Sequence, residues 1–430
     1  MSTFFLACPR NYVTKVSRIR AALIGAIAPG TRLVLVSLVL GGALTANPAW
    51  ASASTPQLNP VSLSFPTPQQ GYVLSLYDCT ARTCAALQLS SDHGASWSAM
   101  AIPGQLNRDL RLVKWGTYGS GYATLSVHFA DLMNGWIYGT VPAPVTPRTA
   151  SPNWVNRLWS THDGGKKWSQ VRLPLTLSGG VIQMSSHAEE TYLFGASFQS
   201  DHAYIFGTPS GEDNWQRKSD ALLGIPAGGG PLEGSFTFAG DNGWFVAGND
   251  RGFTATARLA SDGSWRAWSG PSFEKLGASY APIDAVTGRV LLAEVASGGF
   301  VYPPTSSVPA GWNDGASWLF ISYDAGATFK PFRKLSSGYQ GNYYSTVPGL
   351  PASPTPGTIL TQHASNSTYR VVRSTNWGRT WSVVLDGSAS QVLFATQTAG
   401  FAIVDKPDSQ LTSSLFRTSD SGSQWSSVHL

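Results

Sequence analysis

The sequence predicts an all-β protein, and three observations support this. Residues 52–430 are rich in Gly, Ser, Thr and aromatic residues and poor in charge, a composition typical of β-domains with many turns. A turn pattern, Ser/Thr-x-Asp-x-Gly-x-x-Trp/Phe, recurs along the chain. A second pattern, a turn followed by a β-rich strand, precedes each copy of the first. The spacing of the two patterns predicts the architecture.

The first 51 residues have the pattern of a secretory signal. They contain five basic residues and no acidic one, then the apolar run 33–44, then Ala49 and Ala51 in an A-x-A cleavage pattern. The run has 12 residues, short for a membrane span. We expect a cleaved signal peptide at 1–51 and a secreted or extracytoplasmic domain at 52–430. An uncleaved anchor and a start downstream of Met1 are the alternatives.

The net charge does not indicate nucleic-acid binding. The five basic residues of the predicted signal account for the whole net charge of +5, so residues 52–430 are neutral. Within them, Cys79 and Cys84 are the two cysteines. If they face each other across a hairpin, their Cβ atoms come within disulfide range. We expect this disulfide, with two buried thiols as the alternative; a C-x4-C pair alone does not complete a zinc site.

Each position of the turn pattern has a chemical reason. Asp accepts hydrogen bonds from backbone N–H groups of the turn, Gly adopts a conformation that a side chain opposes, and the aromatic residue packs between neighbouring sheets. The close copies are SSDHGASW (90–97), THDGGKKW (161–168), SYDAGATF (322–329), STNWGRTW (374–381) and TSDSGSQW (418–425). Two copies are degenerate, TPSGEDNW (208–215) and LASDGSW (259–265). We expect structural roles for Asp92, Trp97, Asp163, Trp168, Asp213, Trp215, Asp262, Trp265, Asp324, Phe329, Asn376, Trp381, Asp420 and Trp425.

The acidic positions, with Asn376 in one copy, are separated by 71, 50, 49, 62, 52 and 44 residues. A period of roughly 40–50 residues with insertions is typical of β-propellers. We predict a seven-bladed β-propeller of four-stranded antiparallel blades, with the Asp turn between the third and fourth strands. The chain begins on an innermost strand and ends on an outermost one. The predicted blades are 58–103, 121–174, 179–220, 233–270, 279–333, 341–386 and 389–430.

These turns resemble Asp-boxes, the bacterial neuraminidase repeat. Together with the GW-containing strands, such as MNGWIYG (133–139), they most resemble propellers like the photosystem II assembly factor. The resemblance covers nearly all of 60–430. It implies the fold but not the activity, because sialidases, other glycoside hydrolases and sortilin-type receptors share the turn and differ in function.

Loops opposite the Asp turns are the expected binding surface. In four-stranded up-and-down blades, the insertions 101–121, 140–155, 297–316 and 333–341 emerge on the face opposite those turns, as does the Cys79–Cys84 hairpin. The Pro-rich segment 347–357 is expected on the same face as the Asp turns. Turns on a rigid scaffold often carry binding groups. The candidate partner-binding residues are Trp115, Tyr118, Trp154, Trp312 and Tyr339; the alternative is that they cap small cores of their own loops.

No catalytic, cofactor-binding or metal-binding residue is predicted. The arginine-containing segment that begins many sialidases has no counterpart in LSFPTPQQ (63–70), and the phosphate-loop, G-x-S-x-G and H-E-x-x-H motifs do not occur. The spacing does not show whether Arg108, Arg111, Arg251 and Arg289 converge, and Glu233 is either near the central channel or a solvated loop residue. We expect a monomeric, non-catalytic exported propeller that binds a protein or polysaccharide through its loop-rich face. The alternative is a glycoside hydrolase, sialidase-like, with a divergent active site.

Overall fold

The structure is a computed structural model, and the chain divides into two compact units, Met1–Ser54 and Thr55–Leu430. All described residues belong to the second unit, so the predicted signal at 1–51 lies outside them. The described ranges are 56–114, 125–142, 154–173, 181–196, 203–220, 233–248, 254–268, 278–282, 290–296, 317–336, 350–365, 368–405 and 412–430. No helix in these ranges is long and apolar enough to cross a membrane.

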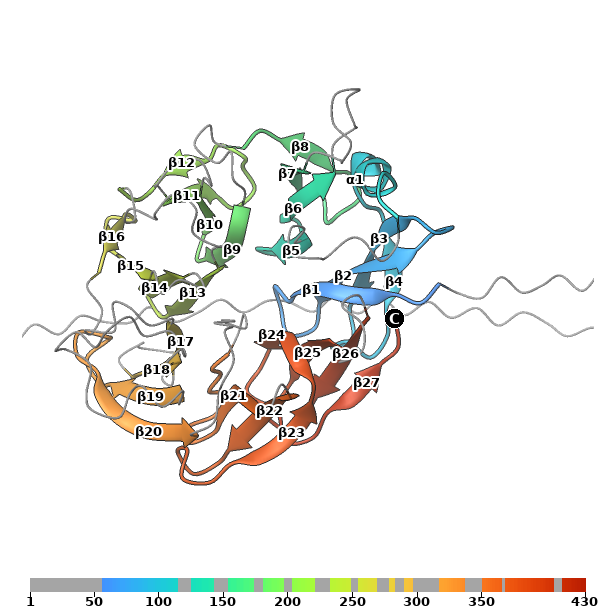
Figure 1. The fold of residues 1–430 in the computed structure, drawn as a ribbon. Helices are drawn as coiled ribbons and strands as arrows, with labels where there is room; N and C mark the ends of the chain where they lie inside the picture. The colour runs from blue at the N-terminus through green and yellow to red at the C-terminus, as the bar shows by residue number, and fades with distance from the viewer. Residues whose placement is uncertain are drawn as a thin grey trace, which may run out of the picture. The chain divides into compact units, whose positions relative to one another are not determined.

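The described residues form seven antiparallel sheets, six of four strands and one of three, each built from strands consecutive in the chain (Figure 1). The first three sheets contain β1 (Asn59–Ser64), β2 (Gly71–Asp78), β3 (Thr83–Ser90) and β4 (Ser98–Met100); β5 (Leu125–Phe129), β6 (Gly135–Pro142), β7 (Trp154–Thr161) and β8 (Ser169–Val171); and β9 (Val181–His187), β10 (Glu190–Ala196), β11 (Ala203–Pro209) and β12 (Gln216–Arg217). The others contain β13 (Glu233–Ala239), β14 (Asn242–Gly248), β15 (Thr254–Leu259) and β16 (Trp265–Ala267); β17 (Ala278–Pro282), β18 (Leu291–Ala296), β19 (Ser317–Ser322) and β20 (Lys330–Ser336); β21 (Ile359–Ser365), β22 (Thr368–Ser374) and β23 (Ser382–Asp386); and β24 (Ser388–Phe394), β25 (Gly400–Asp405), β26 (Ser413–Thr418) and β27 (Ser426–Val428).

In the first, second and seventh sheets, the second strand is buried on both faces. In β2, Tyr72, Val73 and Leu74 are all fully buried, and β6 and β25 are buried over nearly their whole lengths. A strand covered on both faces has no polar side, so its sequence is a continuous apolar run rather than an alternation. This is why GYVLSLYD and GWIYGTVP are the most recognisable strands in the sequence.

Neighbouring sheets contact each other through their first strands and their faces. β1 contacts β5, β9 contacts β13, and β13 contacts β17. Between the first and second sheets, the rings of Tyr72 and Phe129 stack with centroids 3.5 Å apart. Figure 1 shows the first strands turned toward the middle of this unit and the last strands at its edge. Each sheet therefore serves as a packing surface for the next.

The first and seventh sheets also pack together. The Leu63 N–H donates to Gln391 Oε1 at 2.8 Å, and Gln391 Nε2 donates back to the Leu63 carbonyl at 3.0 Å. Val73 of β2 lies in one apolar cluster with Phe401 and Ile403 of β25. The first sheet contains only strands from the start of the described chain and the seventh only strands from its end. Contact between these sheets thus depends on side chains, not on a shared strand.

Two features differ from simple repetition. The helix α1 (Gly104–Leu110) occupies the predicted insertion 101–121, where no helix was expected, and it buries Leu106 and Leu110 against the first sheets. In the sixth sheet, Ala352 forms an isolated antiparallel bridge with Leu360, with N–O distances of 2.9 and 3.0 Å. The Pro-rich segment 347–357, predicted as a turn, therefore supplies a backbone pairing residue to β21.

Candidate functional site

The five close copies of the turn pattern share one hydrogen-bond network. In each, the Ser or Thr hydroxyl donates to the Asp or Asn side chain and accepts the N–H of the pattern's glycine, at 2.8–3.0 Å in all five. The acid in turn accepts later backbone N–H groups, as Asp92 does from Ala95 and Ser96 at 3.0 and 2.9 Å. The side-chain oxygens thus supply acceptors for backbone N–H groups of the tight turn.

The turn contains two successive left-handed residues. His93 has φ +59° and Gly94 φ +74°; Ser421 and Gly422 repeat this with φ +59° and +78°. The first residue's N–H donates to the first-to-second strand turn of the same sheet, at 2.9 Å both from His93 and from Ser421. A Cβ on Gly94 would lie 2.5 Å from the Phe401 ring of the seventh sheet. Glycine is required there both by its conformation and by this close approach.

These hydrogen bonds also fix the charge of the acids. Hydrogen bonds from Ser96 and Ser90 hold the pKa of Asp92 well below its usual range. Bonds from Ser264 and Thr328 lower the pKa of Asp262 and Asp324, respectively, to about 2. A carboxylate held in its ionised form by its own turn is a poor proton donor. The turn acids are therefore suited to structure rather than to acid catalysis.

The aromatic residue that ends each turn lies against the preceding sheet. Trp97 packs in a cluster with Phe401 of the seventh sheet, and Trp265 meets the ring of Tyr192 edge-on at 5.3 Å. The same placement holds for the other five, which contact the preceding sheet or a cluster that contains it: Trp168, Trp215, Phe329, Trp381 and Trp425. These rings connect one sheet to the next.

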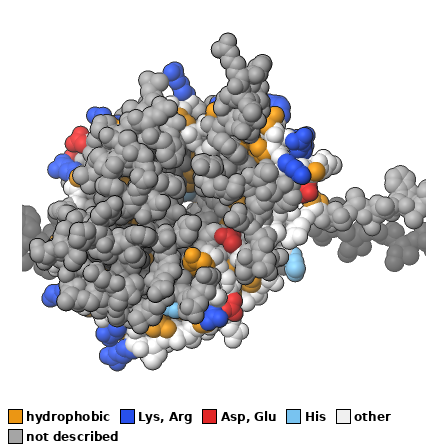
Figure 2. Space-filling model, in the orientation of Figure 1, with side chains coloured by type: hydrophobic (Ala, Val, Ile, Leu, Met, Phe, Trp, Pro, Cys, Tyr) orange, Lys and Arg blue, Asp and Glu red, His pale blue; other side chains and the backbone are white. Residues whose placement is uncertain are grey.

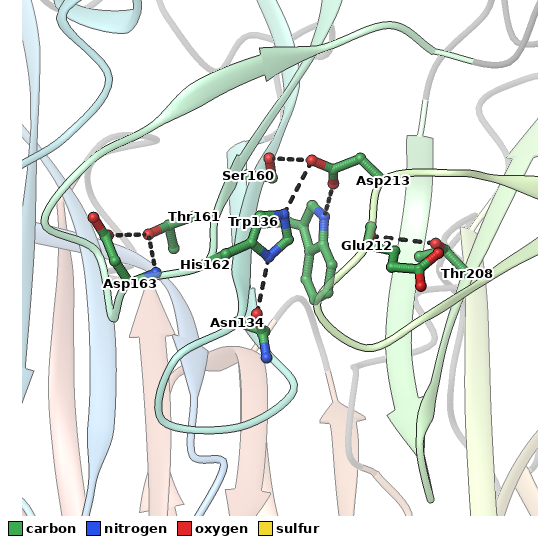
Figure 3. A network of polar contacts seen from close by, with 9 residues as sticks. All are labelled: Asn134, Trp136, Ser160, Thr161, His162, Asp163, Thr208, Glu212 and Asp213. Atoms are coloured by element: carbon green, nitrogen blue, oxygen red, sulfur yellow. Dashed lines mark hydrogen bonds and ion pairs between the residues drawn. The ribbon is translucent and has the colours of Figure 1, made fainter.

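Asp213 departs from the pattern, and the expectation that it holds its own turn needs correction. Its carboxylate accepts Trp136 Nε1 at 3.1 Å and the Ser160 hydroxyl at 2.6 Å, both from the second sheet, and lies 3.1 Å from His162 Nε2 (Figure 3). The reason is that the degenerate turn has its Asp five residues after Thr208 instead of two, which leaves the carboxylate facing the neighbouring sheet. Asp213 joins two sheets.

The cluster around Asp213 contains Ser, His and Asp but not the geometry of a catalytic triad. A triad needs the hydroxyl bonded to the imidazole and the imidazole bonded to the acid. Here Ser160 and His162 both contact the acid, and the other imidazole nitrogen lies 2.9 Å from Asn134 Oδ1. Figure 3 shows Ser160 and His162 directed at the Asp213 carboxylate, with Asn134 on the other nitrogen of His162. The arrangement binds two sheets together and leaves no activated hydroxyl.

Two tryptophans of the GW strands were not predicted to have a role. Trp136 of β6 contacts Asp213, and Trp244 of β14 donates its Nε1 hydrogen to the Ala325 carbonyl at 3.2 Å. Both rings are fully buried and reach the Asp turn of the following sheet. The signal was the Gly-Trp pair at the start of a second strand, which occurs at 135–136 and 243–244.

The end of the first sheet opposite its Asp turn carries a group of cations. Arg82 lies at the tip of the β2–β3 hairpin, and Arg108, Arg111 and Lys114 lie on and just after α1; all four are exposed. We call these four side chains the hairpin–helix surface. β3 runs from this surface to the turn at 90–97, about 25 Å at 3.3 Å per residue. The surface is therefore well separated from the Asp turns.

The disulfide Cys79–Cys84 forms as expected and closes this hairpin, with Cα atoms 5.8 Å apart. The register differs from the prediction, because Cys84 pairs with Tyr77 and Cys79 lies beyond the end of β2. The turn places Thr80 and Ala81 at φ +64° and +60°, and Asp78 Oδ1 accepts the Ala81 N–H at 2.7 Å. Arg82 is thus presented by a doubly constrained turn.

Most of the other predicted binding residues lie outside the described part of the chain. Trp115, Tyr118, Trp312 and Tyr339 lie outside the described residues, as do Arg251 and Arg289. Trp154 begins β7, where its backbone pairs with Pro142, and Glu233 begins β13, where it pairs with Gly248; both side chains lie outside the described part. Arg108 and Arg111 come together, but on the hairpin–helix surface.

Comparison with known proteins supports the fold. No family model and no curated protein sequence matches the chain. Among solved structures, an ulvan lyase, described as a polysaccharide lyase, superposes with a TM-score of 0.52 and 11% identity over 87% of this chain and 96% of that one; its complex with -[GlcA(1-4)Rha3S]- gives 0.51. A prolyl endopeptidase has a TM-score of 0.51 and 11% sequence identity over 86% of this chain. This chain covers 49% of that protein. The β-propeller domain of the trilobed protease from Pyrococcus furiosus has a TM-score of 0.45 and 8% sequence identity, over 87% of this chain and 98% of that one.

Proposed function

We propose that the chain is an exported seven-bladed β-propeller of the Asp-box type that binds a polysaccharide through the face opposite its Asp turns. The seven described sheets, and the packing of the first against the seventh, support a closed ring of blades. The short spacing of the turn hydrogen bonds, two to four residues, supports the Asp-box assignment.

One observation supports a binding role best: a group of exposed cations lies on a closed hairpin and a helix, at the end of the first sheet opposite its Asp turn. At one end, the acids are engaged within their own turns or, for Asp213, between two sheets. At the other end, the hairpin–helix surface presents exposed cations on a disulfide-closed hairpin. Rigid elements that carry exposed polar groups are typical of binding surfaces. The scaffold end and the binding end are thus distinct.

The cell envelope or the extracellular space is the proposed location. The disulfide Cys79–Cys84 is typical of proteins from oxidising compartments. The signal pattern of residues 1–51 agrees with export. A polysaccharide is the proposed ligand because a protein of similar fold, the ulvan lyase, acts on one. A protein partner, as for an assembly factor, is the alternative occupant of the same face.

A second candidate is a polysaccharide-degrading enzyme, either the glycoside hydrolase expected from the sequence or a lyase. It is favoured by the same structural neighbour, whose complex contains -[GlcA(1-4)Rha3S]-. Such an enzyme needs acid and base groups placed across the scissile bond. In the described residues, the Ser160, His162 and Asp213 cluster does not provide them, because its groups bond to one another across two sheets.

A glycan array with the secreted, disulfide-bonded protein tests the proposal. We expect binding to a limited set of glycans, and no change in the size of those glycans after prolonged incubation. A pull-down from the native envelope fraction, treated with glycan-degrading enzymes or with protease, separates the two kinds of partner. Retention of the partner after complete protein digestion supports a polysaccharide; loss of the partner on protease treatment, with an empty array, contradicts it.

A further inference from the structure

The cations of the hairpin–helix surface are held close together by backbone and side-chain contacts. Arg82 forms an antiparallel bridge with Lys114, and the Thr83 N–H donates to the Val113 carbonyl at 3.3 Å. Arg111 Nε donates to Cys84 Sγ at 3.4 Å, and Arg108 lies one turn earlier in α1. The disulfide, the hairpin and the helix therefore form one rigid support. Figure 2 shows Lys and Arg side chains at the edge where α1 and β3 lie in Figure 1.

Two of the three arginines on this surface, Arg108 and Arg111, have neutral partners. Arg108 donates its Nε and Nη2 hydrogens to Gln105 Oε1, at 3.2 and 2.7 Å, and Arg111 contacts a disulfide sulfur. Neither contact compensates a positive charge. Both guanidinium groups keep further N–H donors, since each carries five. The arginines are therefore oriented but not neutralised.

Among the described residues, two acids lie on the same elements as these four cations. Asp78 is exposed in the hairpin turn beside Arg82, where its Oδ1 accepts the Ala81 N–H. Asp109 is 2% exposed, bonds to Gln105 Nε2 and lies 3.8 Å from Arg157 Nε. This leaves a local excess of positive charge on a domain, residues 52–430, that is neutral as a whole. An uneven distribution of this kind attracts an anionic partner.

The chemistry of the surface favours a sugar polymer over a protein or a membrane. Guanidinium groups bind carboxylate and sulfate oxygens in pairs of hydrogen bonds, the anions that uronic and sulfated sugars carry. Protein hot spots and membrane-bound surfaces need apolar anchors. Within the described part of this surface, Leu112 is the one exposed large apolar side chain, at 40%. A row of cations matches a chain with repeated negative charges.

We propose that the hairpin–helix surface binds a polyanionic polysaccharide through Arg82, Arg108 and Arg111. The inference rests on the proposed function and names its ligand class and site. It is independent of the Asp turns, which lie at the other end of the sheets. Because the contacts are charge-assisted, the affinity falls as salt concentration rises.

The experiment measures binding of the full secreted chain to dextran sulfate, polygalacturonate and neutral dextran at low and moderate salt. The test variant is R82Q/R108Q/R111Q. The matched control is K166Q/K167Q/R379Q, which removes three exposed charges from two Asp turns. We expect the test variant to bind at least about tenfold more weakly, a loss of about 1.4 kcal/mol, because it removes three groups that form charge-assisted hydrogen bonds. The control keeps its affinity within about twofold.

Each other outcome has a defined meaning. Equal weakening in both triple variants shows non-specific attraction and overturns the inference. Tighter binding to anionic lipid vesicles than to both polyanions, or binding only to neutral glycans, overturns it as well; in the latter case the proposed function stands. If neither anionic nor neutral glycans bind, the proposed function fails too. Should the test variant melt at a lower temperature, Arg82→Glu at the exposed tip replaces it, and unchanged affinity for dextran sulfate then counts against the surface.

Discussion

The indole nitrogen of Trp136 donates to Asp213 Oδ1 at 3.1 Å, linking the second strand of one sheet to the third-to-fourth strand turn of the next. Trp244 repeats the contact with the Ala325 carbonyl two sheets later. Together with the aromatic residue of each turn, which packs in the opposite direction, these contacts connect neighbouring sheets through both polar and apolar groups.

Trp136→Phe should destabilise the protein because it removes a hydrogen bond to a partly buried carboxylate. We expect a loss of about 2–3 kcal/mol in the free energy of unfolding, measured with denaturant. Trp159→Phe is the matched control, since Trp159 is equally buried and its Nε1 has no hydrogen-bond partner. Equal losses in the two variants would show that the Asp213 contact contributes nothing.

Asp324→Asn should make the protein less sensitive to acid. The hydrogen bond from Thr328 lowers the pKa of Asp324 to about 2, so the carboxylate stabilises the fold above its unfolded pKa near 3.8, and this stability is lost as pH falls toward 2. Asn376 occupies the equivalent position, and its Oδ1 accepts the Thr380 N–H as Asp324 Oδ1 accepts the Thr328 N–H. We expect a melting temperature close to the original at pH 7 and a smaller decrease between pH 4 and 2. An unchanged acid profile would contradict this role.

His128→Gln should remove a second, separate pH dependence. Burial lowers the pKa of His128 to about 4, beside Ser186 at 2.7 Å and the Trp136 ring. Because the folded state holds the neutral form, stability present above the unfolded pKa of 6.5 is lost as pH falls toward 4. Thermal melts between pH 7 and 4 measure the effect; we expect a flatter profile in the variant, and a profile equal to that of the wild type would contradict this role.

Loss of the disulfide should weaken the hairpin that carries Arg82. C79A/C84A opens a loop of six residues, for which loop entropy gives about 2 kcal/mol. Urea unfolding of the oxidised protein and the variant measures the difference. Wild-type protein treated with reductant should show a similar loss, whereas stability unaffected by both changes would show that the hairpin is held by the sheet alone.

Ala81→Gly should stabilise the same hairpin. Ala81 has φ +60°, a conformation that costs a residue with a side chain about 1–2 kcal/mol and costs glycine little. Since glycine also gains freedom in the unfolded chain, the expected net gain is about 0.5–1 kcal/mol. Urea unfolding at pH 7 tests it, with the exposed Ala95→Gly, in a different turn, as the comparison; a loss of stability would show that the turn is not strained.

Local interactions made much of the fold predictable. Asp92 bonds to groups within four residues of itself, and Gly94 lies within the same turn, so their spacing in the sequence reflects one compact geometry. The continuous apolar runs of β2 and β6 likewise report burial on both faces. Where geometry repeats within a few residues, the sequence pattern is enough to predict it.

Contacts between distant residues were not predictable. Trp136 and Asp213 are 77 residues apart, and neither position alone indicates that the ring reaches the next sheet. α1 depends on burial of Leu106 and Leu110 against strands on both sides of it in the sequence, such as β3 and β6. Ala352, which pairs with Leu360, lies in a Pro-rich segment whose sequence favours a turn. For the proposed binding site, the arginines of α1 and the hairpin are brought together by the fold, whereas the aromatic candidates were predicted from residue type and from their place in long loops.

One measurement tests the central claim most directly: equilibrium binding of a labelled polyanionic polysaccharide to the secreted protein, with the polymer's size determined in the same sample before and after overnight incubation. We predict saturable, salt-sensitive binding that R82Q/R108Q/R111Q weakens, and a polymer of unchanged length. Shortened polymer, or binding that is the same in the wild type and this variant, would contradict it.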